Sequence, residues 1–380
     1  MRVLHIAAEF PPITWGGMGT AVGGLCRASA RAGMTAAVLL VGGILVLPEE
    51  AGPFSNEEGW LNADGVRLFQ IAPSDGPQRT IDLVRRWQPD LLHLHTAWLW
   101  DTIRPVLEVT GLPFVFTVHS LDRAEYEIGR LVSAWENQAQ VLVAANRIVV
   151  PSKSEAALLV RYYPEVGSRV RVAANGIDER PIAVRERRGE PPTVLFSGRF
   201  VERKGIGELL AAIPEVLSVR PTTRFVLAGG YGGPAEVDFM GLQQQMAPYR
   251  QQVHFTGWLA AEEMDAWYRR SDILVVPSWY EPFGMVVLEG MLHGLAVAAT
   301  AVGGPAEILD HGRTGWLFAS RNVDALKAAL IQLVDSAELC LQLGAAAQEA
   351  VRRHWLWPQV LQKLTCVYRE AIGCRDSYEI

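Results

Sequence analysis

Two glutamates separated by seven residues stand in the run EPFGMVVLE, in the second half of the chain. Glu281 lies in the loop after the apolar run Ile273–Val276, which predicts a strand, and Glu289 lies in a helix predicted to begin near Met285. The free backbone N–H groups at such a helix start favour negative charge. We expect Glu281 to accept hydrogen bonds from sugar hydroxyls and Glu289 to accept both hydroxyls of a ribose. The alternative is that both are solvated acids on a loop and a helix face.

Two cations follow another predicted strand. Arg199 and Lys204 lie in GRFVERKG, between the apolar run Thr193–Phe196 and a helical segment. Lysine is rare in this chain, with four residues against 31 arginines, so its placement at the end of a strand is informative. A pair of cations there suits a diphosphate, whose negative charge must be stabilised as it leaves. An exposed basic loop is the alternative, which the neighbouring acidic motif weakens.

A glycine-rich turn follows the first predicted strand. Gly16 and Gly17, in WGGMG, have no side chain to collide with a phosphate that approaches the backbone. The run does not complete the GxGxxG pattern of dinucleotide-binding proteins, so a dehydrogenase is weakly supported. An ordinary tight turn is the alternative.

His119 follows the predicted strand Phe114–Val118 directly, in TVHSLDR. Ligands of parallel sheets bind beyond the carboxyl ends of the strands, so this ring is expected to face a ligand. A structural role is the alternative for any single histidine. His93 and His95, in LLHLHTAW, are less informative, because one of them can point into a core.

These residues require a scaffold of strands and helices, and short apolar runs do alternate with segments of helical spacing. Before residue 179 the predicted strands are Val3–Ala7, Ala37–Val41, Val66–Ile71, Leu91–Leu94, Phe114–Val118, Arg147–Val150 and Arg171–Ala173, with helices at Thr20–Ala32, Thr80–Trp87 and Leu131–Ala145. After residue 192 the strands are Thr193–Phe196, Phe225–Ala228, Val253–Phe255, Ile273–Val276 and Ala296–Ala299, with helices at Gly205–Val219, Glu262–Ser271, Met285–His293, Asp324–Leu333 and Ala337–His354. The charged, proline-containing stretch 179–192 predicts a linker. The pattern therefore predicts two doubly wound α/β domains that offer strand ends to one cleft.

Composition narrows the class of protein. A chain of 380 residues with 49% hydrophobic and 20% charged residues fits two globular domains. The net charge of −6 argues against nucleic-acid binding. Four cysteines without a CxxC pair or a Cys/His cluster suggest neither a zinc site nor a disulfide framework. We see no signal peptide and no apolar window long enough to span a membrane, so we expect a cytoplasmic protein, with peripheral membrane contact left open.

Together the motifs resemble those of the retaining GT-B glycosyltransferases with an E-x7-E signature, a family that includes glycogen synthases, sucrose-phosphate synthases and bacterial group 1 glycosyltransferases. The resemblance covers essentially the whole chain. Its motifs are EFPPITWGGMGTAVGGL, HSLDR, NGID, GRFVERKG, EPFGMVVLE and AVGGPAEI.

The resemblance implies a GT-B fold of two Rossmann-like domains. Residues 1–180 would bind the acceptor, with a C-terminal helix at 359–380 packing back on them, and residues 181–358 would bind the nucleotide sugar. It implies catalytic roles for Glu281, His119, Arg199 and Lys204. It implies nucleotide-sugar contacts from Gly16, Gly17, Arg199, Lys204, Leu259, Glu281, Phe283, Gly284, Met285 and Glu289.

The implied activity is retaining transfer of a sugar from a nucleotide diphosphate sugar, with UDP or GDP as the expected nucleotide. The chain contains no Asp-x-Asp motif, so we expect neither a metal ion nor another cofactor. The acceptor stays open between a saccharide, a small metabolite and a lipid-linked sugar, facing polar loops at Trp98–Asp101 and Asp122–Arg130. Alternatives are a nucleotide-sugar epimerase, a phosphorylase that needs a pyridoxal lysine, and a non-catalytic sugar-binding protein.

Overall fold

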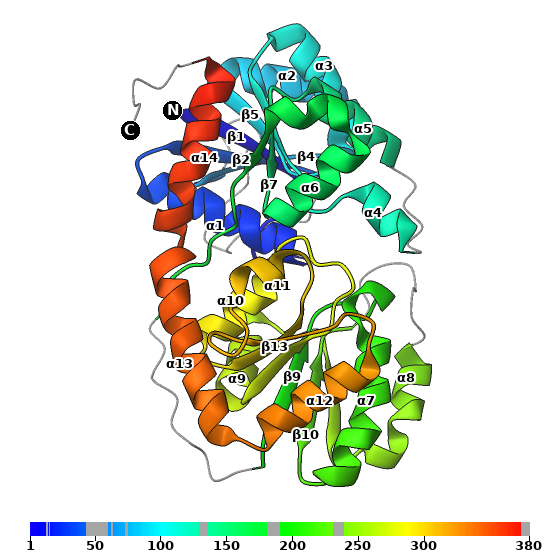
Figure 1. Cartoon of the computed structure of the whole chain (residues 1–380). Coiled ribbons are helices and arrows are strands. Elements are labelled where there is room, and N and C mark those ends of the chain that lie inside the picture. Colours follow the sequence, from blue (N-terminus) through cyan, green and yellow to red (C-terminus); the bar gives the residue numbers. More distant parts are fainter. Residues whose placement is uncertain are drawn as a thin grey trace. The chain divides into compact units, whose positions relative to one another are not determined.

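The computed structural model describes residues 1–12, 14, 16–42, 60–61, 64–72, 75–128, 135–180, 191–230 and 239–373. The chain divides into two compact units (Figure 1). Unit 1 comprises Met1–Asp178 together with Trp357–Ile380, and unit 2 comprises Glu179–Leu356. Each unit is a parallel sheet with helices, which confirms the predicted α/β class.

Unit 1 is built on an eight-stranded sheet with the order β3-β4-β2-β1-β5-β6-β7-β8. Its strands are β1 (Arg2–Ala7), β2 (Thr35–Val41), β3 (Trp60–Leu61), β4 (Arg67–Ile71), β5 (Leu91–Leu94), β6 (Phe114–Thr117), β7 (Arg147–Val150) and β8 (Val170–Val172). Neighbouring strands pair in parallel except β3, which runs antiparallel to β4. The inner strands are mostly apolar and almost entirely buried, as expected for a sheet covered on both faces, with His5 and His93 among the buried polar exceptions.

The helices of unit 1 include two that come from opposite ends of the chain. They are α1 (Gly17–Arg31), α2 (Gly76–Trp87), α3 (Trp100–Thr110), α4 (Asp122–Glu127), α5 (Trp135–Ala144), α6 (Lys153–Tyr162) and α14 (Trp357–Ile372), with 3-10 turns at Ala97–Leu99 and Pro164–Arg169. α14 packs against α1 and across β5, β6 and β7 (Figure 1). Its residues Leu361, Leu364 and Tyr368 share a core with Val3 and Leu91. The last helix thus completes the first unit.

Unit 2 is built on a six-stranded sheet with the order β11-β10-β9-β12-β13-β14. Its strands are β9 (Thr193–Ser197), β10 (Arg224–Ala228), β11 (Val253–Gly257), β12 (Ile273–Val276), β13 (Ala296–Thr300) and β14 (Trp316–Phe318). All its neighbours pair in parallel. Its helices are α7 (Ile206–Val219), α8 (Phe239–Gln245), α9 (Ala261–Arg270), α10 (Met285–Leu292), α11 (Gly303–Ile308), α12 (Val323–Val334) and α13 (Ala337–His354), with 3-10 turns at Glu202–Lys204 and Ala247–Tyr249.

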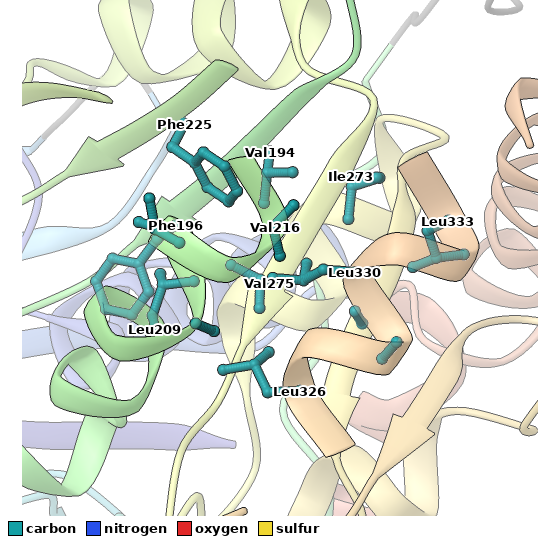
Figure 2. Close-up of a cluster of buried hydrophobic side chains, with 14 of the residues drawn as sticks. Val194, Phe196, Leu209, Val216, Phe225, Ile273, Val275, Leu326, Leu330 and Leu333 are labelled. Carbon is teal, nitrogen blue, oxygen red and sulfur yellow. The ribbon is translucent and has the colours of Figure 1, made fainter. Parts of the chain in front are cut away.

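The core of unit 2 fills the space between the sheet and the pair α7 and α12. Figure 2 shows Leu209 and Val216 of α7 and Leu330 of α12 directed toward Val194 and Val275 of the sheet. These side chains are fully or almost fully buried. Each buried aliphatic side chain of this size stabilises the fold by about 1.5–3 kcal/mol relative to an exposed one, so this core holds the strand ends of unit 2 in a fixed frame.

The predicted strands all occur, with ends that shift by one or two residues. The predictions missed several helices, among them α3, α6 and α8. The segments Trp98–Asp101 and Asp122–Glu127, which were expected to be loops, are helical. Asp101 and Glu125 lie in the first turns of their helices, where acidic residues are favoured. Trp15, Arg130 and 181–190 of the predicted linker lie outside the described residues.

In the described parts of the chain, no single helix is long and apolar enough to cross a membrane. Only α12 and α13 taken together pass such a test, and they are bent by 98° relative to each other.

Candidate functional site

The strand order of unit 2 reverses between β9 and β12. The chain leaves β9 through α7 toward β10 on one side, and leaves β12 through α10 toward β13 on the other. Ligands of doubly wound sheets bind beyond the carboxyl ends of the strands at such a reversal. The loop after β9 contains Arg199 and Lys204, and the loop after β12 contains Glu281. The fold therefore brings the predicted cations and the first glutamate of the motif to one edge of the sheet.

Lys204 and Glu281 form an ion pair. Lys204 Nζ lies 2.5 Å from Glu281 Oε2, and the hydroxyl of Ser278 donates to the same oxygen at 3.2 Å. Glu281 is 7% exposed, so this carboxylate depends on its partners for the charge stabilisation that water would give. Sequence analysis did not identify Ser278, although its position two residues after the end of β12 was a signal for it.

Electrostatics keep this carboxylate ionised. Burial alone would raise the pKa of Glu281, but the charges of Lys204 and Arg203 outweigh burial and lower it below its ordinary value. Burial lowers the pKa of Lys204, Arg203 and Arg199 add to that effect, and Glu281 opposes it. Lys204 and Arg203 thus act on Glu281, and Arg199 acts on Lys204, so positive charge exceeds negative charge among these residues, a balance that favours an added anionic ligand.

The backbone around Glu281 is fixed by the motif AVGGPAEI. The Gly304 N–H donates to the Glu281 carbonyl at 2.9 Å. A Cβ atom on Gly304 would lie 2.0 Å from the Phe283 carbonyl oxygen, so no larger residue fits there. Gly284, with φ of 98°, caps the N-terminus of α10 in the left-handed conformation, which favours glycine. These contacts hold the segment from Glu281 to Gly284 against the start of α11.

Glu289 lies one turn into α10 and has a partner that sequence analysis missed. The Tyr268 hydroxyl donates to Glu289 Oε2 at 2.7 Å. Burial and the Glu289 charge raise the pKa of Tyr268 well above its ordinary value, so the phenol stays a donor. Tyr268 also stacks on His293, with ring centroids 4.8 Å apart. Nothing in the E-x7-E spacing pointed to a tyrosine on α9. Leu259, the predicted base contact, is half-buried and follows β11.

The remaining predicted residues lie in unit 1. Gly16 and Gly17 are exposed at the start of α1. His119 follows β6 and is half-buried, and its Nε2 atom lies 3.1 Å from Nδ1 of His95. The site residues thus form two groups, one at the strand ends of each unit.

The sequence analysis found no Cys/His cluster along the chain, whereas the fold of unit 1 brings three histidines together. His5, His93 and His95 each offer a ring nitrogen, and these nitrogens lie within 4.8 Å of one another. His93 and His95 are both buried; the sequence had suggested that one of them can point into a core. The physical reason is the two-residue period of a strand, which directs both rings to one face, where His5 of the neighbouring strand joins them.

Two family models match the chain in separate regions. The model described as glycosyl transferases group 1 matches residues 178–350, and the model described as glycosyltransferase family 4 matches residues 15–180. Their common border lies close to the division between the two units.

Similar proteins match over most of their length. The chain is 26% identical over 403 residues to a glycogen synthase of Mycobacterium tuberculosis, which covers 98% of this chain and 95% of that protein. It is 31% identical over 342 residues to D-inositol 3-phosphate glycosyltransferase 2 of Catenulispora acidiphila, covering 84% of this chain and 79% of that protein. A solved structure of sucrose-phosphate synthase from Thermosynechococcus elongatus has a TM-score of 0.81 at 21% identity, covering 98% of this chain and 100% of that one. The predicted GT-B fold is confirmed.

Proposed function

We propose that this chain transfers a sugar from a nucleoside diphosphate, without a metal ion and with retention at the anomeric carbon. The premise is that the chain belongs to the glycosyl transferases group 1 family and is a glycosyltransferase with the GT-B fold. One observation supports this proposal most: the buried ion pair of Lys204 and Glu281 at the strand-order reversal of unit 2. The pair places Lys204, a cation that can bind a phosphate, beside Glu281, a carboxylate that can accept hydrogen bonds from sugar hydroxyls.

The proposed chemistry uses charges of unit 2. Arg199 and Lys204 bind the diphosphate, and the N–H groups of Phe283, Gly284 and Met285 lie at the start of α10, where anions are favoured. When the bond between the anomeric carbon and the phosphate oxygen breaks, negative charge grows on that oxygen and these donors stabilise it. The acceptor hydroxyl attacks the anomeric carbon from the same face, and its proton passes to the leaving phosphate.

The other site residues position the donor. Glu281 accepts hydrogen bonds from hydroxyls of the transferred sugar. Glu289, one of whose oxygens accepts from Tyr268, accepts hydrogen bonds from the ribose hydroxyls, and Leu259 contacts the base. Gly16, Gly17 and His119 contribute from unit 1, which we assign to the acceptor, while residues 181–358 bind the nucleotide sugar.

For the donor we propose a UDP- or GDP-sugar, and for the acceptor a saccharide or a small molecule. The matched relatives are named as a glycogen synthase, a D-inositol 3-phosphate glycosyltransferase and a sucrose-phosphate synthase, which supports acceptors of both kinds. We also propose a cytoplasmic location. Use of a nucleotide-sugar donor supports it, and so do the free, buried thiols of Cys26 and Cys340.

Release of a free nucleoside diphosphate from a nucleotide sugar, dependent on acceptor, is the expected result in a panel of donors and acceptors. EDTA is expected to leave the rate unchanged, because Arg199 and Lys204 supply the charge that a metal would otherwise supply. Loss of activity with EDTA, restored by magnesium or manganese, would overturn metal independence. An epimerase would convert the donor without releasing nucleotide, and a binding protein would do neither.

Neutralising Glu281 and neutralising Glu289 are expected to have different effects on donor binding and transfer. Glu281→Gln should weaken transfer and change the preference among donor sugars while retaining affinity for the free nucleoside diphosphate, because a carboxylate facing hydroxyls discriminates between sugars. Glu289→Gln should also weaken binding of the free nucleotide. It should reduce the difference in affinity between donors with ribose and donors with 2′-deoxyribose. Calorimetric titration with nucleotide and with nucleotide sugar measures both effects.

The matched control is Glu215→Gln, since Glu215 is a half-exposed acid of α7 that pairs with Lys327 at 2.6 Å. It should bind both ligands like the unmodified protein. Loss of nucleotide affinity in Glu281→Gln, with Glu289→Gln unaffected, would reverse our orientation of the donor.

A further inference from the structure

Three histidine rings form a hydrogen-bonded chain in unit 1. His119 Nε2 lies 3.1 Å from His95 Nδ1, and His95 Nε2 lies 3.0 Å from His5 Nδ1. His5 and His95 are 0% and 2% exposed, whereas His119 is half-buried. The chain therefore connects a ring at the carboxyl edge of the sheet with one that is sealed in the core.

The sheet register explains how these rings meet. His5 on β1 lies opposite His93 on β5, so both side chains leave the same face, and His95 follows on that face two residues later. His93 is not part of the chain. Its Nδ1 pairs with the Tyr368 hydroxyl at 2.8 Å and its Nε2 with the Thr117 hydroxyl at 2.7 Å.

All three rings of the chain are neutral near neutral pH. Burial lowers the pKa of His5 to about 3 and that of His119 to about 4. Burial, with the neighbouring imidazoles adding to it, lowers the pKa of His95 well below its ordinary value. Tyr368 of α14 and Cys26 of α1 are also buried, and burial raises the pKa of each, so neither supplies a negative charge. A neutral imidazole has one N–H and one lone pair, so the hydrogen bonds of the chain must all run in one direction.

The inner end of the chain decides that direction. Within the described residues, His5 Nε2 is buried and has no hydrogen-bond partner. If the chain donated inward, an N–H would be sealed there without an acceptor, and buried N–H groups without partners are the rarer defect in proteins. If the chain donates outward, only a lone pair is left at that point.

We propose that His5 and His95 are positioning residues that hold His119 in a single tautomer. His5 Nδ1–H donates to His95 Nε2, and His95 Nδ1–H donates to His119 Nε2. His119 is then left with its proton on Nδ1, which has no partner in the part of the chain that the structure describes and is free for a ligand.

The consequence for the reaction rests on the proposed function. A His119 ring with N–H on Nδ1 can donate to an oxygen of a bound ligand but has no lone pair there to remove a proton. His119 would thus be a fixed hydrogen-bond donor and not a general base. The two inner histidines set this role without touching the substrate.

The tautomer can be read directly from ring-nitrogen NMR of the ligand-free full chain with labelled histidine. We expect His119 with Nδ1 protonated and Nε2 bare. In His95→Leu, His119 should move toward the Nε2–H form that a neutral imidazole favours in water. In His95→Asn the side-chain amide can donate in place of the Nδ1–H and should restore the original form. His119 already in the Nε2–H form in the unmodified protein would overturn the proposal, and so would a stoichiometric metal ion bound by His5, His93 and His95.

Turnover provides the second measurement. His95→Leu should lower kcat on the order of 10-fold, as expected for loss of a supporting partner, with KM for the donor little changed and partial recovery in His95→Asn. The control is His93→Gln, which alters the same cluster outside the chain and should keep the tautomer of His119. Transfer activity with a tautomer that does not respond to His95→Leu would refute this inference alone. Absence of any transfer, with the tautomer as expected, would refute only the proposed function.

Discussion

Lys204→Ala is expected to lower transferase turnover about 10²–10³-fold, the effect of removing one donor that stabilises charge in a transition state, or about 3–4 kcal/mol. Lys204 is the lysine at the strand-order reversal of unit 2, and it holds the buried carboxylate of Glu281. Its removal takes away the main partner of Glu281 and the charge that we propose faces the leaving phosphate. Steady-state kinetics with a nucleotide sugar measures the loss.

Folding must be separated from chemistry in this variant, because a buried carboxylate that loses its partner destabilises the fold. Thermal unfolding identifies that effect, and Arg199→Ala, which leaves the ion pair in place, should also lose most turnover. Lys327→Ala is the matched control, since Lys327 pairs with Glu215 and Asp324 on the surface of unit 2. Wild-type rates in folded Lys204→Ala and Arg199→Ala would contradict the proposal that these two residues bind the diphosphate.

Apolar patterns in the sequence located most strands and the residues at their ends, but not the short strands β3 and β14. An apolar run such as Ile273–Val276 has no polar face, so only a buried parallel strand accommodates it, and the ends of this strand and of Leu91–Leu94 were predicted to the residue. Because ligand residues follow strand ends, Lys204 and Glu281 were assigned to one site before their contact was known. Local patterns were sufficient there.

Partners that come from distant elements were not predictable. Tyr268 on α9 reaches Glu289 on α10 because α9 packs on β9 and α10 packs on the neighbouring strand β12. Its position in an amphipathic helix has the same pattern as a core tyrosine. The histidine chain is a similar case, since the pairing of β1 with β5 brings together residues 90 positions apart. A spacing motif describes one segment, and these contacts depend on the order of strands in the sheet.

Mild acid is expected to destabilise unit 1 through His5, His93 and His95. Burial lowers the pKa of each far below the ordinary value of 6.5, to about 3 for His5. The folded state therefore binds no proton on these rings where the unfolded chain already does. Stability from this source is complete above pH 6.5 and is lost as pH falls below it. At one pH unit below 6.5 the loss is about 1.4 kcal/mol for each ring, or about 4 kcal/mol for three, a large share of the 5–15 kcal/mol of a typical domain.

Direct titration of the protons taken up on unfolding in denaturant tests this at pH 5.5, where His5, His93 and His95 should contribute about three protons and His119, whose pKa is lowered to about 4, about one more. Carboxylates with lowered pKa, such as Glu281 and Glu370, titrate below about pH 4.5 and do not interfere in this window. His5→Phe should reduce the uptake by about one proton and make the fold less sensitive to acid. His254→Gln, which changes an exposed histidine of unit 2, should alter neither. An unchanged uptake in His5→Phe would mean that the buried cluster is already protonated in the folded state, and the neutral histidine chain that orients His119 would then have to be abandoned as well.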